Sequence, residues 1–126
     1  MIKLNNKAPV FKVPSTGNKE YSLNDSHGKY VVLYFYPKDD TPGCTIETKD
    51  FNTLLPKFKK LNCEIYGISK DDLKSHNKFR EKYKVKFNLL ADEEKKIIKD
   101  YKVWGKKKFM GKEFMGIIRT TFLIDK

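Results

Sequence analysis

Cysteine and arginine are scarce in this sequence. Its 126 residues include two cysteines, Cys44 and Cys63, and two arginines, Arg80 and Arg119. Two thiols far apart in the chain cannot form the disulfide framework of a small secreted domain. A reactive thiol is useful in a reducing cytosol, so we predict a cytoplasmic protein.

The charge balance is one-sided, because lysine supplies all but two of the 27 basic residues and the net charge is +11. Nucleic acid is therefore a partner to consider. Readout of base edges and stacking on bases favour arginine over lysine, however, and the lysines are spread along the whole chain. We expect a solvated basic surface with weak, salt-sensitive adhesion to polyanions and no specific nucleic-acid partner.

Several other signatures are absent. No segment approaches the roughly 20 apolar residues of a membrane span, and residues 1–7 lack the apolar stretch of a signal peptide, so no membrane association is expected. Glu47 stands where a Cys-x-x-Cys oxidoreductase has its second cysteine. His27 and His76 are expected to face solvent, which argues against a Cys–His hydrolase and a zinc site.

The pattern of apolar residues predicts one α/β domain over residues 1–126. Residues 11–23 are expected to form a hairpin with its turn at Gly17, and Pro56 to kink the first helix or start a second helical piece. Residues 103–114 are expected to form a loop with a short helical turn. The other expected strands are 30–36, 64–69, 87–90 and 117–124, and the expected helices are 44–61, 71–83 and 92–101. This alternation is typical of a sheet with helices on its faces.

The most informative segment is the junction before Cys44. The run from Tyr30 to Tyr36 is aromatic and β-branched without polar alternation, which indicates a strand buried on both faces. Pro37 ends it, and turn residues lead to Cys44 at the start of a helix. Free N–H groups and the helix dipole stabilise negative charge there, and can lower the pKa of a thiol from about 8.5 to roughly 3.5–7.5. The sequence therefore predicts a nucleophilic thiolate.

These residues also carry a resemblance to a known family. Pro37-x-x-x-Thr41-x-x-Cys44 resembles the active-site signature of the peroxiredoxins. The string from Phe35 to Glu47 resembles the bacterioferritin-comigratory (PrxQ) branch, and the segment from Gly116 to Asp125 follows in the expected order. The resemblance implies a thioredoxin-like fold with a central mixed sheet, helices on both faces and an N-terminal β-hairpin. It also implies a thiol-dependent peroxidase without a metal or organic cofactor.

Arg119 is the second candidate residue. It stands in an otherwise apolar or threonine-bearing strand, where a charge is costly unless an anion pairs with it. Glu47 could form a structural ion pair with it. The resemblance instead places the guanidinium beside the Cys44 sulfur, where it would stabilise the thiolate and hold the substrate oxygens. Both arrangements can hold at once, with Glu47 orienting Arg119.

The remaining site residues follow from the chemistry of breaking an O–O bond. The leaving oxygen gains negative charge, so donors placed there accelerate the step. We expect the hydroperoxide to be bound by the Thr41 hydroxyl, the backbone N–H groups of Gly43 and Cys44, and Arg119. Pro37 offers no donor and little flexibility, so its expected role is to shield the sulfur and fix the turn.

A sulfenic acid on Cys44 needs a second thiol to reduce it, and here the sequence departs from the branch. Many members have a resolving cysteine five residues after the first, where this chain has Lys49, and others have it in the helix matching residues 71–83, which contains none. Cys63 is expected to be a buried core residue. It lies roughly 20 Å or more from Cys44, whereas a disulfide tolerates a Cα separation of up to about 7 Å. We expect an external reductant, namely thioredoxin, glutaredoxin or a small thiol, with an intermolecular Cys44–Cys63 bridge as the less favoured option.

The chain stops at Lys126, whereas members of the branch continue with a further strand and helix. If the chain is complete as given, a sheet edge and some apolar surface are uncovered, which favours low stability or self-association, whereas truncation could impair activity. We therefore expect a monomer or a weak homodimer. The alternative functions are a degenerate, inactive peroxiredoxin and, with less support, a basic nucleic-acid-binding module.

Overall fold

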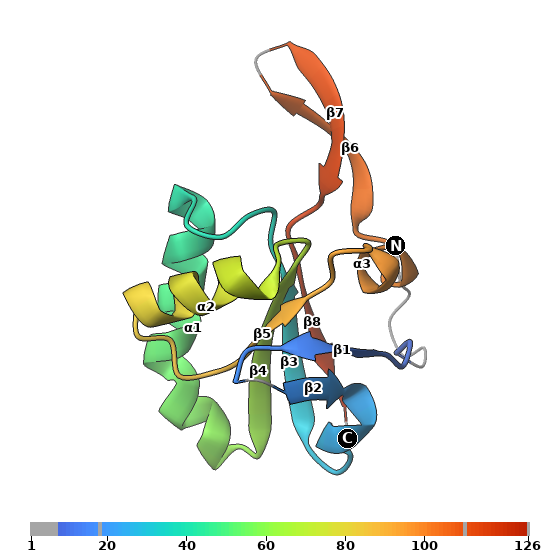
Figure 1. The fold of residues 1–126 in the computed structure, drawn as a ribbon. Helices are drawn as coiled ribbons and strands as arrows, with labels where there is room; N and C mark the ends of the chain where they lie inside the picture. Colours follow the sequence, from blue (N-terminus) through green and yellow to red (C-terminus); the bar gives the residue numbers. More distant parts are fainter. Residues whose placement is uncertain (1–7, 18, 110, 126) are drawn as a thin grey trace.

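The computed structural model describes residues 8–17, 19–109 and 111–125, and Figure 1 shows how its elements are arranged. One six-stranded sheet has the order β2-β1-β5-β4-β3-β8, and β6 pairs with β7 in a second sheet. The strands are β1 (Lys12–Ser15), β2 (Lys19–Ser22), β3 (Tyr30–Phe35), β4 (Cys63–Ser69), β5 (Leu89–Ala91), β6 (Trp104–Phe109), β7 (Lys112–Ile117) and β8 (Thr120–Ile124). The helices are α1 (Pro42–Lys60), α2 (Leu73–Lys82) and α3 (Lys96–Asp100), with a short 3₁₀ helix η1 (Leu23–Ser26).

The large sheet is mixed, as expected. Strand β4 runs parallel to both β3 and β5, whereas β8 pairs antiparallel with β3 and β1 pairs antiparallel with β5. The β1–β2 pair is the expected N-terminal hairpin, and Gly17 has the positive φ of 84° that its turn requires. Asn18, which was expected in the same turn, lies outside the described residues.

Strand β3 supplies side chains to two cores, which confirms that it is buried on both faces. Its odd-numbered residues, such as Leu33, pack in the cluster that contains α3 residues Ile97 and Ile98. Tyr34 and the following Tyr36 pack in the cluster with residues of α1 and α2. Helices therefore cover both faces of the sheet, with α1 and α2 on one side and α3 on the other (Figure 1).

The segment 103–114 contradicts the prediction of a loop with a helical turn. Its residues instead form most of the β6–β7 hairpin, which extends away from the large sheet in Figure 1. Both faces of this hairpin carry exposed side chains, so its strands need no alternation of apolar and polar residues. The consecutive lysines at 106–108 therefore lack the alternation by which a strand is recognised in a sequence. The positive φ of Gly111, 80°, suits the tight turn between the strands.

The predicted strand 117–124 is also wrong in one respect. Ile117 ends β7 and Thr120 begins β8, so Ile118 and Arg119 lie between two strands that pair with different partners. Pro56 neither ends nor divides α1, which runs unbroken from Pro42 to Lys60. None of the helices in the described part of the chain combines the length and the apolar composition needed to cross a bilayer.

Candidate active site

Cys44 lies in the first turn of α1, as the sequence predicted. Thr41 is the N-cap in an extended conformation, Pro42 is the first helical residue, and the first helical bond runs from the Thr45 N–H to the Thr41 carbonyl at 2.8 Å. The N–H groups of Gly43 and Cys44 precede that bond, so no carbonyl of the helix can accept from them. The Cys44 side chain is therefore at the positive end of the helix, and it is fully buried.

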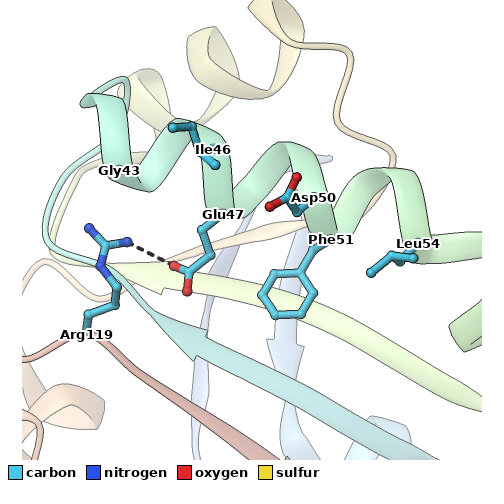
Figure 2. Close-up of a pocket in the computed structure, with 7 residues that line it drawn as sticks. All are labelled: Gly43, Ile46, Glu47, Asp50, Phe51, Leu54 and Arg119. Carbon is cyan, nitrogen blue, oxygen red and sulfur yellow. Dashed lines mark hydrogen bonds and ion pairs between the residues drawn. The ribbon is translucent and has the colours of Figure 1, made fainter.

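Arg119 makes both contacts that the sequence suggested. Its Nη2 donates to the Cys44 Sγ at 3.2 Å, and its Nη1 donates to Glu47 Oε1 at 3.1 Å, the contact drawn in Figure 2. Glu47 lies one helical turn after Cys44, so the same guanidinium bridges two residues of α1. The charge is only partly buried, because 40% of the Arg119 side chain is exposed where the chain passes from β7 to β8.

The charges at this site influence one another. Partial burial by itself would lower the pKa of Arg119, but the Cys44 sulfur and the Glu47 carboxylate outweigh it and raise that pKa above its ordinary value. Burial raises the pKa of Glu47, although the neighbouring Arg119 opposes the shift. Arg119 therefore stays cationic next to the sulfur.

Gly43 permits the close approach of Arg119. A Cβ atom added at Gly43 would lie 3.2 Å from Arg119 Nη2, closer than ordinary van der Waals contact. From the sequence only the backbone N–H of Gly43 was expected at the site, so this steric role was not predicted. A glycine directly before the cysteine, where the turn passes into a helix, was the available signal.

The other two expected site residues lie in the turn before α1. The Thr41 hydroxyl donates to the Lys38 carbonyl at 2.9 Å, so its hydrogen is directed into the turn and its oxygen lone pairs are left as acceptors. The expected role of this hydroxyl as a donor to the leaving oxygen does not match that bond. Pro37 is half-buried directly after Tyr36, at the end of the strand.

A hollow of about 420 Å³ lies beside Arg119 along α1 (Figure 2). Its walls are mostly apolar, and Ile46 and Leu54 are exposed to 63% and 39%. Phe51 also lines it and stacks on Tyr34 of the sheet, with ring centroids 4.8 Å apart. The residues that line the hollow are Gly43, Ile46, Glu47, Asp50, Phe51, Leu54 and Arg119. It offers an apolar surface next to the guanidinium.

A buried polar cluster adjoins the same turn and was not predicted. His76, expected at the surface, is fully buried, and its Nδ1 lies 2.7 Å from Asp39 Oδ2, whereas His27 is exposed as expected. Asp71 joins them, and one atom of each of the three could approach a common metal ion. These atoms already have hydrogen-bond partners in the protein, so the cluster is better described as a hydrogen-bond network.

Cys63 lies at the other end of α1 and is buried, as predicted. It begins β4, and burial raises the pKa of its thiol. The helix between the two cysteines separates them by roughly 24 Å, because Lys60 lies 16 positions after Cys44 and each position rises about 1.5 Å. A disulfide within the chain is therefore incompatible with this fold.

Comparison with known proteins agrees with this geometry. Residues 4–126 match the model of the AhpC/TSA family. Peroxiredoxin Bcp of Bacillus subtilis is 47% identical over 125 residues, which is 99% of this chain and 80% of the relative. The structure of the bacterioferritin comigratory protein of Xanthomonas campestris, described for its alkyl peroxide reduction activity, has a TM-score of 0.84 and 40% identity over 90% of this chain and 72% of that one.

A third match is a yeast mitochondrial 1-Cys peroxiredoxin, described for thiol resolution via the glutathione and thioredoxin systems. Its structure has a TM-score of 0.83 and 29% identity, and covers 99% of this chain and 63% of that one. These likenesses confirm the thioredoxin-like fold that the resemblance implied. The chain belongs to the AhpC/TSA family and, within it, to the peroxiredoxin Bcp branch of thiol-dependent peroxidases.

Proposed function

We propose that this peroxiredoxin reduces hydrogen peroxide and small organic hydroperoxides through a sulfenic acid on Cys44. The observation that carries the proposal is the 3.2 Å contact between Arg119 Nη2 and the Cys44 Sγ at the start of α1. A fixed cation and the positive end of a helix both stabilise a thiolate, which is the nucleophilic form of cysteine. The alkyl peroxide reduction activity of the Xanthomonas relative supports the same substrate class.

The site residues then have distinct roles in the oxidation step. The Cys44 thiolate attacks the terminal oxygen of the hydroperoxide, the S–O bond forms as the O–O bond breaks, and the released alkoxide takes a proton to become an alcohol or water. Arg119 and the free N–H groups of the helix start stabilise the negative charge on the leaving oxygen. The Thr41 hydroxyl oxygen accepts the hydroperoxide O–H and orients it, because its own hydrogen binds Lys38. Pro37 limits the movement of the turn.

An external thiol completes the cycle. It condenses with the Cys44 sulfenic acid to a mixed disulfide and water, and a second thiol releases reduced Cys44 by disulfide exchange. Thioredoxin, glutaredoxin or a small thiol could serve, and the yeast 1-Cys relative, described for resolution via the glutathione and thioredoxin systems, supports such a cycle. The distance of Cys63 from Cys44 also favours it. Because Cys44 is fully buried, a protein reductant needs the first turn of α1 to open.

Turnover of peroxide by single-cysteine variants tests this proposal. We would measure consumption of hydrogen peroxide and of an organic hydroperoxide with thioredoxin or a small thiol as reductant, for Cys44→Ser and Cys63→Ser. Consumption should disappear in Cys44→Ser and stay within about twofold of wild type in Cys63→Ser, since the two sites do not touch. Activity that survives in Cys44→Ser would refute the proposal. Loss of activity in Cys63→Ser would refute the one-cysteine cycle.

A further inference from the structure

We propose that Asp39 and His76 are positioning residues for Cys44. They form a buried pair that fixes the turn before α1 to helix α2, and thereby hold the Cys44 sulfur against Arg119. The inference rests on the proposed role of Cys44 in the oxidation step. Neither residue touches the sulfur, so each acts through the backbone of the turn.

The hydrogen bonds of His76 define the state of the pair. His76 Nε2 lies 2.8 Å from the Leu90 carbonyl, which can only accept, so Nε2 carries a hydrogen. His76 Nδ1 lies 2.7 Å from Asp39 Oδ2, and a proton must lie between them for a hydrogen bond to form. The two side chains are 0% and 3% exposed, so water cannot replace this bond. Whichever of the two atoms carries that proton, the bond joins the turn to α2.

Asp39 is fixed by further bonds. Tyr36 donates its hydroxyl to Asp39 Oδ1 at 2.5 Å, and Ser75 of α2 donates to Asp39 Oδ2 at 2.8 Å. The Asp39 backbone N–H donates to Asp71 Oδ2 at 2.8 Å. A buried network in which each member is satisfied is rigid, and removal of one member leaves several polar groups without partners.

The turn transmits this constraint to the sulfur. Asp40, directly after Asp39, has a left-handed backbone with φ of 58°, and its carboxylate accepts from Lys82 Nζ at 2.7 Å and from the Tyr83 hydroxyl at 2.6 Å. Both aspartates of the turn are therefore attached to α2 or to the residue after it. Thr41, the N-cap of α1, follows at once, so a displaced Asp39 displaces the first helical turn and Cys44. A shift of about 1 Å between reacting groups can slow a reaction about 100-fold.

The experiment uses Cys63→Ser as the background, so that Cys44 is the only thiol. In that background we would compare Asp39→Asn, Asp39→Ala, Ser75→Ala and the control Tyr101→Phe. Tyr101→Phe removes a hydroxyl that donates to the Pro9 carbonyl, and Tyr101 packs in a different core cluster from Cys44. Two rates are measured for each: oxidation of Cys44 by hydrogen peroxide and alkylation of Cys44 by iodoacetamide. Thermal unfolding reports the stability of each variant.

Asp39→Ala should oxidise about 30- to 100-fold more slowly and be alkylated faster than the background protein, because a loosened turn exposes the sulfur and moves it from Arg119. Asp39→Asn should stay within about threefold, since its amide N–H can donate to His76 Nδ1 and its oxygen can accept from Tyr36. Ser75→Ala removes one donor and should slow oxidation about threefold, which keeps the test valid if Asp39→Ala does not fold. Tyr101→Phe should change neither rate, whatever its loss of stability.

Three results would overturn the inference. The first is that Asp39→Ala, or Ser75→Ala if Asp39→Ala does not fold, matches the background protein in both rates. Asp39→Asn could be as slow as Asp39→Ala, which would show that charge and not position matters. Tyr101→Phe could reproduce the effects, which would assign them to stability. If the background protein itself does not react with peroxide, the proposed function fails instead, and the alkylation rates still decide whether Asp39 positions Cys44.

Discussion

A buried cysteine lies in the first turn of helix α1 and another lies just after its last turn, yet their surroundings differ. Cys44 is 0% exposed and Cys63 is 5% exposed, so accessibility does not distinguish them. The sulfur of Cys44 accepts a hydrogen bond from a guanidinium and lies at the positive end of the helix. The sulfur of Cys63 is 3.6 Å from the Glu64 carbonyl, and burial and the Glu64 carboxylate both raise the pKa of its thiol.

The two sulfurs therefore differ in the charges around them, and we expect this difference to set their reactivity. A thiolate forms where donors and cations surround it, and a thiol stays neutral where apolar groups and an anion surround it. Substitutions that make the surroundings of Cys44 more like those of Cys63 test this contrast.

Removal of the guanidinium should have the largest effect. Arg119→Met keeps much of the side-chain length but removes the donor to Cys44 and the cation of the site. We expect the rate of Cys44 oxidation by peroxide to fall about 100- to 1000-fold, the range found for loss of one donor from an oxyanion site. Stopped-flow measurement of peroxide oxidation checks this. Arg119→Lys should recover part of the loss, because it restores the charge without the two-pronged contact to Cys44 and Glu47. Equal rates for Arg119→Met and wild type would contradict the role of Arg119.

Loss of the Glu47 carboxylate should have a smaller effect. Glu47→Gln keeps an acceptor for Arg119 Nη1 but removes the charge that orients the guanidinium. Because this pair is partly exposed, we expect a roughly three- to tenfold slower oxidation of Cys44, measured as second-order rate constants. Asp50→Asn, which removes a carboxylate from the same hollow, is a matched control and should leave the rate unchanged. Equal losses in both variants would show that the oxidation rate depends on the total negative charge around the hollow and not on the contact between Glu47 and Arg119.

Gly43→Ala should separate activity from stability. The added Cβ would crowd Arg119 Nη2 and push it away from the sulfur, so we expect about two- to fivefold slower oxidation. The same change replaces a flexible residue inside a helix and should raise the free energy of unfolding by about 0.5–1 kcal/mol. Peroxide kinetics and urea unfolding would test the two effects. A variant that is both faster and more stable would contradict the steric role of Gly43.

The prediction with the smallest effect on activity is about the pH at which the Cys63 thiol reacts. Its raised pKa keeps the thiol protonated at neutral pH, and its alkylation should become appreciable only as the pH rises above the ordinary value of 9.0. The same shift makes the free energy of unfolding depend on pH. The protonated Cys63 thiol favours the folded state below pH 9.0, and this contribution is lost as the pH rises through the pKa of the thiol in the folded protein. Alkylation of Cys44→Ser from pH 7 to 11, followed by intact mass, measures it. Rapid alkylation at pH 7 would contradict the assignment.

The sequence was sufficient for the features that depend on neighbouring residues. The buried strand before Pro37 and the helix start at Cys44 follow from a run of apolar residues, a strand terminator and turn residues, all within 15 positions. The contact of Arg119 with Cys44 and Glu47 was anticipated because an isolated cation among apolar residues needs an anion, and because the family resemblance placed it beside the sulfur.

Contacts between distant residues for which the family resemblance gave no guide were not predicted. Whether residues 117–124 form one strand or two is decided by β6 and β3, the separate partners of β7 and β8. His76 resembled a surface residue among lysines, but its partners include Asp39 and Leu90, 37 and 14 positions away. Such pairings belong to tertiary structure, which local pattern does not contain.

The central claim is that Cys44, and not Cys63, is the reactive thiol. The most direct test mixes the reduced wild-type protein with limiting hydrogen peroxide and a sulfenic-acid trap, and locates the trapped group by peptide mass over time. The account predicts trapping on Cys44, at a rate far above that of free cysteine, with Cys63 unmodified. Trapping at both cysteines at the same rate, or on Cys44 no faster than free cysteine, would contradict it.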